Sequence, residues 1–97
     1  MDINEILDFI SRRFSREYNW MNGNCYWFAA TLSARFKFLI IWYEPVEGHF
    51  YAGDDEGTVF FDWHGAHINL ENRPIKLSEI ASNDELWYSR LLKDCVY

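Results

Sequence analysis

The chain has 97 residues, which is enough for one hydrophobic core and too few for two, so we expect a single domain over residues 1–97. Hydrophobic residues make up 49% of it and aromatic residues 20%, a composition that excludes a disordered chain. Nine basic residues against 15 acidic ones give a formal net charge of −6. This charge opposes direct binding to nucleic acid or to an anionic membrane.

The sequence also favours a cytoplasmic location. The first five residues lack the basic region and apolar run of a secretory signal, and the longest apolar stretch, residues 38–43, is too short to span a bilayer. Cys25 and Cys95 lie far apart in the sequence, and in a reducing compartment we expect no disulfide between them. We interpret Cys95, near the chain end, as a structural or exposed residue.

In chain order, the first predicted element is an amphipathic helix over about residues 3–17. Apolar side chains recur there at three-to-four spacing. Asp2 and Glu5 have the spacing of a capping box, which indicates that the helix begins just after Asp2. Residues 19–24, with three asparagines and a glycine, have the composition of a turn.

A second helix is predicted from Cys25 to about Arg35, with Asn24 as its cap. Cys25 would then begin the helix and point to its packed side. The helix dipole and the free backbone N–H groups of a first turn favour a thiolate over a thiol. Cys25 is therefore a candidate nucleophile, and a hydrolytic cysteine also needs a base and a group that orients the base.

The middle of the chain predicts three short strands, at residues 38–43, 49–53 and 58–63, the last two joined by a hairpin turn at 54–57. If this turn has four residues, His49 pairs directly with Asp62. Directly opposed residues of an antiparallel pair share a face, so the carboxylate can orient the imidazole. A three-residue turn would instead place His49 opposite Trp63.

The rest of the chain predicts mostly helix. Residues 65–74 read as irregular, and residues 77–81 as a short helical turn. Ser82 and Glu85 form a second capping box, which predicts a C-terminal helix through about Lys93.

Two segments carry a resemblance to a known family. The first is the predicted helix start, Gly23-Asn24-Cys25-Tyr26-Trp27-Phe28-Ala29 with Leu32. The second is a pair of strands, Gly48-His49-Phe50-Tyr51 followed by Phe61-Asp62-Trp63-His64-Gly65. In these segments the chain resembles the nucleophile helix and the His and Asp strands of transglutaminase-like and small papain-like cysteine enzymes of bacteria and phages. The similarity covers about residues 19–65. It implies a Cys25-His49-Asp62 triad.

The resemblance implies a minimal papain-like α+β fold, with the nucleophile helix on an antiparallel sheet of about three strands and flanking N- and C-terminal helices. The implied function is a cysteine hydrolase or acyl transferase that acts on an amide, thioester or isopeptide bond of a protein or peptide-like substrate. No cofactor is required for this chemistry. Papain-like enzymes place an oxyanion-holding amide before the helix, and Asn19 has that spacing, although the backbone N–H of Cys25 is the stronger candidate.

Other interpretations of the polar residues remain open. Asp62, His64 and His67 have the spacing Asp-x-His-x-x-His, which is compatible with metal ligands. No helix or Cys-x-x-Cys motif supports a metal site here, so we interpret both histidines as loop residues and expect no metal. His64 is also a substitute base if the hairpin register differs.

A rival function belongs to another class: a catalytically silent fold that binds and inhibits a partner protein, for example a phage anti-defence or anti-CRISPR protein. The acidic and aromatic side chains suit such a surface, with these candidates: Trp27, Trp63, Asp54, Asp55 and Glu56. The sequence does not determine the oligomeric state.

Overall fold

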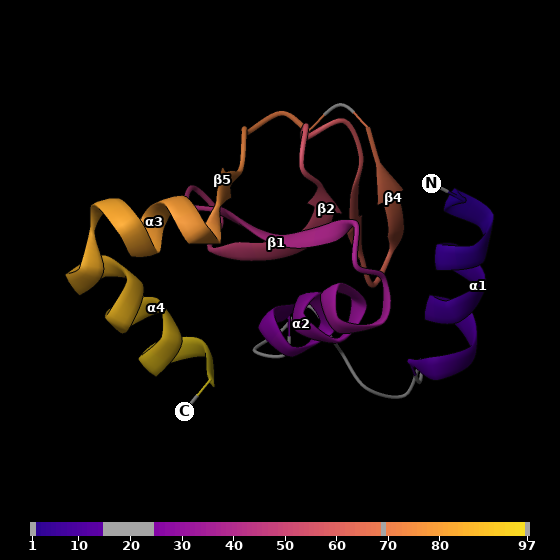
Figure 1. The fold of residues 1–97 in the computed structure, drawn as a ribbon, viewed down its shortest axis with the longest axis horizontal. Helices are drawn as coiled ribbons and strands as arrows, with labels where there is room; N and C mark the ends of the chain where they lie inside the picture. The colour runs from indigo at the N-terminus through magenta and orange to yellow at the C-terminus, as the bar shows by residue number, and fades with distance from the viewer. Residues whose placement is uncertain (1, 15–24, 69, 97) are drawn as a thin grey trace.

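A computed structural model describes residues 2–14, 25–68 and 70–96, with the side chains of 94–96 left out. It confirms the α+β class. Within these residues, four helices accompany a five-stranded antiparallel sheet (Figure 1). The elements are α1 (Ile3–Arg13), α2 (Cys25–Arg35), β1 (Leu39–Glu44), β2 (His49–Asp54), β3 (Phe60–Asp62), β4 (Gly65–His67), β5 (Ile75–Lys76), α3 (Leu77–Asn83) and α4 (Glu85–Val96).

The sheet has the strand order β4-β3-β2-β1-β5, so it is wider than the three or so strands that were predicted. β4 and β5 are the additional strands, with three and two residues. The expectation that residues 65–74 are irregular was therefore wrong for Gly65–His67. Strands this short have no alternation to detect, and only their pairing with β3 and β1 defines them.

The two faces of the sheet are covered differently. α2 packs its apolar side on one face, where Phe28 and Leu32 join the main core with Phe50 and Phe61. Residues 70–74 arch over the other face (Figure 1). Under this arch lies a second, smaller cluster that consists of Trp42, Tyr51 and Phe60 with Ile40 and Leu70.

The remaining helices lie at the two ends of the sheet, with α1 beside β4 and the α3–α4 pair beyond β5 (Figure 1). α1 begins where predicted, because Asp2 accepts a hydrogen bond from the Glu5 backbone N–H, but it ends at Arg13 because Phe14 is extended. None of the helices in the described part of the chain has both the length and the apolar character needed to cross a membrane.

The second capping box was wrong. The cap of α4 is Asp84, whose carboxylate accepts from the Trp87 backbone N–H, while Ser82 lies inside α3. Asp, like Ser, has a short polar side chain that can accept from a free N–H of a first turn, and Asp84 follows Ser82 by two residues.

Candidate cysteine-histidine-aspartate site

Cys25 is the first residue of α2, as predicted, and its side chain is 7% exposed. The helix dipole therefore acts on a thiol that is largely shielded from water. Burial raises the pKa of this thiol, but contacts with His49 and with the backbone N–H groups of Phe50 and Tyr26 outweigh it. As a result, the pKa of Cys25 lies below its ordinary value of 9.0.

The predicted direct pairing of His49 with Asp62 was wrong. The observed partners are Gly53 with Phe60 and Ala52 with Phe61, which moves the register by two residues and sets Asp62 opposite Tyr51. The cause is the Asp54 carboxylate, which accepts from the backbone N–H groups of Thr58 and Val59 and so holds both residues in the turn.

The register shift nevertheless leaves His49 and Asp62 together. A slip by two residues keeps side chains on their original face, so the two residues become diagonal neighbours instead of opposed ones. His49 Nε2 lies 3.4 Å from Asp62 Oδ2, and both side chains are buried. This separation is long for a hydrogen bond and fits an ion pair. Since Nε2 faces the carboxylate, Nδ1 is the ring nitrogen left for Cys25.

Electrostatics at this site favours a charged pair. Burial lowers the pKa of His49, but its contacts with Asp62 and Cys25 dominate and raise that pKa to about 9. A lowered thiol pKa next to a raised imidazole pKa means that this site favours the thiolate-imidazolium pair over the neutral thiol and imidazole. This is the ionisation state that a cysteine nucleophile requires.

Two groups besides His49 contact the Asp62 carboxylate. Its Oδ1 atom lies 2.8 Å from His67 Nε2 and accepts from the backbone N–H of His64, also at 2.8 Å. Burial raises the pKa of this carboxyl, but the contacts with His49, His67 and His64 lower it below its ordinary value. Asp62 is therefore a carboxylate shared by two imidazole rings.

His67 is the site residue that our sequence reasoning did not place. Its strand, β4, pairs with β3 so that His67 lies opposite Phe60, on the same face as Asp62. A two-residue turn at Trp63-His64 would have given this pairing, but the three-residue strand β4 was not recognised.

A comparison with known families identifies the family of this chain. The family model of Phage YunG-like proteins matches residues 3–94. The chain belongs to this Phage YunG-like family. No curated protein and no solved structure matches it.

Some predicted residues of this Phage YunG-like chain fall outside the description. Asn19, the weaker oxyanion candidate, lies outside the described residues, as does Asn24, and the side chain of Cys95 is likewise not described. Within the described residues, no group of three or more His, Cys, Asp or Glu side chains is arranged to hold a metal ion.

The residues of the predicted binding surface are dispersed. Trp27 is 48% exposed on α2, whereas Trp63 is half-buried against the main core. The Asp54 carboxylate accepts a hydrogen bond from the Thr58 backbone N–H, and Asp55 forms an ion pair with Lys76 at 2.9 Å. Glu56 remains exposed at the turn.

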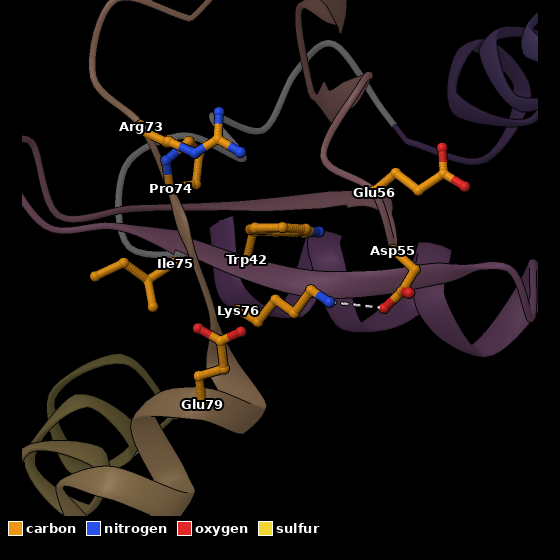
Figure 2. Close-up of a pocket in the computed structure, with 8 residues that line it drawn as sticks. All are labelled: Trp42, Asp55, Glu56, Arg73, Pro74, Ile75, Lys76 and Glu79. Atoms are coloured by element: carbon orange, nitrogen blue, oxygen red, sulfur yellow. Dashed lines mark hydrogen bonds and ion pairs between the residues drawn. The ribbon is translucent and has the colours of Figure 1, made fainter.

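A pocket of about 540 Å³ lies on the arched face, beside β1 and β5 (Figure 2). The Lys76 ammonium lies 5.6 Å from the centre of the Trp42 ring, between that ring and Asp55. Arg73 and Glu79 approach the same space from the arch and from α3 (Figure 2). Positive and negative groups thus alternate here, and no residue of the Cys25 site lines the pocket.

Proposed function

We propose that this chain is a cysteine hydrolase or acyl transferase of papain-like type, with Cys25 as nucleophile, His49 as acid and base, and Asp62 as the group that orients His49. The observation that carries the proposal is that His49 contacts both Cys25, at the start of a helix, and Asp62, together with the lowered pKa of the thiol. Each element of this arrangement matches a requirement of nucleophilic catalysis.

The chemistry follows from these roles. The Cys25 thiolate attacks the carbonyl carbon of an amide or thioester, and a carbon–sulfur bond forms while the carbonyl oxygen takes up negative charge. The backbone N–H of Cys25 stabilises this oxyanion. The His49 imidazolium then gives its proton to the leaving amine or thiol, and a thioester on Cys25 remains.

The second half of the cycle reuses His49. Now neutral, it takes a proton from water or from an acceptor amine as that group attacks the thioester. The carbon–sulfur bond breaks, the acyl group leaves on the acceptor, and the thiolate-imidazolium pair is restored. Asp62 keeps Nε2 engaged throughout, so that Nδ1 remains directed at sulfur.

An activated ester tests this cycle without knowledge of the natural substrate. With p-nitrophenyl acetate, we expect a rapid release of nitrophenol and an acetyl group on Cys25, found by mass mapping of a trapped sample. Cys25→Ser is the matched control, because it keeps the shape of the side chain and replaces the sulfur. The proposal is wrong if acetylation of the wild-type protein matches that of Cys25→Ser, or if Cys95 alone is acetylated.

An alternative is a protein of this fold that acts by binding and inhibiting a partner. The observation that favours it is the 7% exposure of the Cys25 side chain, which leaves little thiol surface for a substrate. Under this alternative, Cys25→Ala retains the full biological effect. Lysine substitution of Asp55 and Glu56 would then weaken partner binding mainly through the association rate.

A further inference from the structure

A second pocket, of about 230 Å³, lies next to the proposed triad. It is bounded by the end of β1 and the following loop, by β2 and β4, and by the arch over the sheet. Three of its lining side chains are carboxylates: Glu44, Glu47 and Glu71. Glu44 is 3% exposed, and its two oxygens accept from the backbone N–H groups of Val46 and Glu47, so its charge is held in place.

Tyr51 also lines this pocket and is the observation that points to a ligand. Its side chain is 7% exposed, yet its hydroxyl has no hydrogen-bond partner among the described residues. Burial and the charges of Asp62, Glu47 and Glu44 raise its pKa to about 12, so the hydroxyl keeps its proton. The ring is buried but the hydroxyl oxygen keeps some contact with solvent, so a polar group bound in the pocket can reach it and become its hydrogen-bond partner.

The pocket also lacks a counter-charge. In the described part of the chain, neither Glu47 nor Glu71 forms an ion pair with a lysine, arginine or histidine. Among the described residues that line the pocket, the one basic side chain is His67, and it bonds Asp62. Negative charge of this kind attracts a cation, and a neutral phenol can accept from an ammonium or guanidinium group.

We propose that this pocket binds the cationic end of a lysine or arginine side chain of the substrate. The proposal rests on the proposed function, because two lining residues of the pocket, Tyr51 and His67, contact the triad residues His49 and Asp62. The Tyr51 ring lies 4.5 Å from the His49 ring, centre to centre, and His67 joins the pocket to Asp62. A side chain bound here would thus position the adjoining acyl group near His49.

The size of the pocket agrees with this class of ligand. Sites for drug-sized molecules usually have volumes of about 300–1,000 Å³, and 230 Å³ is smaller. One extended side chain is therefore a better match than a cofactor. An organic cation with several N–H donors can bond both the carboxylates and the phenol oxygen of this pocket.

The test uses the Cys25→Ala protein, so that binding is measured without turnover. N-acetyl-lysine amide, N-acetyl-norleucine amide and spermidine are titrated separately and followed by backbone amide NMR shifts. We expect the lysine compound to bind, with shifts at Tyr51 and Glu71, and the norleucine compound to bind at least about tenfold more weakly, because it lacks the charge-assisted hydrogen bonds. Tyr51→Phe, which removes only the hydroxyl, should weaken lysine binding by about tenfold.

A matched pair of double variants separates local from general charge effects. Glu47→Gln with Glu71→Gln removes two exposed carboxylates of the pocket, and Glu56→Gln with Glu79→Gln removes two exposed carboxylates elsewhere on the same face. We expect about fivefold weaker binding or more in the first pair and little change in the second. Equal loss in both pairs, equal binding of lysine and norleucine, or tighter binding of spermidine than of the lysine compound would overturn the proposal. Because Cys25 is absent, these outcomes do not depend on whether the triad is active.

Discussion

The His49→Gln substitution gives the sharpest test of the thiolate at Cys25. His49 is buried and is the main polar partner that lowers the thiol pKa, so glutamine at this position should return that pKa toward or above 9.0. A thiol with a pKa of 9.0 is only about 1% ionised at pH 7, so full ionisation gains up to about a hundredfold in thiolate. A thiolate with a lower pKa is also intrinsically less nucleophilic, so the alkylation rate rises by less than the thiolate fraction does. We therefore expect slower alkylation at pH 7, on the order of tenfold.

The assay measures the rate of iodoacetamide alkylation as a function of pH. All proteins carry Cys95→Ser, so that Cys25 is the one thiol that can be alkylated. The wild-type rate should reach its plateau at a lower pH than the rate of His49→Gln. His64→Gln is the matched control, since His64 is exposed and its backbone N–H, not its ring, contacts Asp62. Circular dichroism must show that both variants are folded. Superimposable pH profiles for wild type and a folded His49→Gln would refute the reasoning.

Two further predictions concern Asp62 and the hairpin. Asp62→Asn removes the carboxylate that favours the imidazolium, so the NMR titration midpoint of His49, about 9 in the wild type, should move to lower pH; an unchanged midpoint would contradict the ion pair. Gly53→Ala should lower the unfolding free energy by about 1–3 kcal/mol, since the new Cβ would lie 2.8 Å from a ring carbon of Phe60 and 2.9 Å from the Val59 carbonyl oxygen. Thermal unfolding measures this loss, and an unchanged midpoint would show that β3 can move.

The sequence predicted the long elements of the fold and missed the short ones. Helical periodicity and the cap at Asp2 predicted α1, the turn composition before Cys25 predicted α2, and aromatic and β-branched residues between turn signals predicted β1 and β2. β4 and β5 are defined by hydrogen bonds to their neighbours and carry no pattern of their own. The end of α1 and the start of α4 were misjudged because several nearby side chains could serve as a boundary.

The sequence placed Cys25, His49 and Asp62 near one another, but it gave the wrong offset between His49 and Asp62 and did not place His67 beside them. Cys25 could be placed from the start of a helix, and His49 and Asp62 from their strands. The position of Asp62 along β3 depended on the length of one turn, and the hydrogen bonds of the Asp54 carboxylate determine that length. Side-chain capping of a turn is a local effect that composition alone does not reveal.

The longer turn has a consequence for the chemistry. A shift of one residue would have moved His49 and Asp62 to opposite faces, whereas a shift of two keeps the face and changes only the offset. With Asp62 opposite Tyr51, one carboxylate oxygen lies toward His49 and the other lies toward β4, where His67 contacts it. Asp62 thus connects the proposed triad to the wall of the acidic pocket. If the triad and the pocket serve one reaction, His67→Gln should alter both the His49 titration and lysine binding, whereas two independent sites would separate these effects.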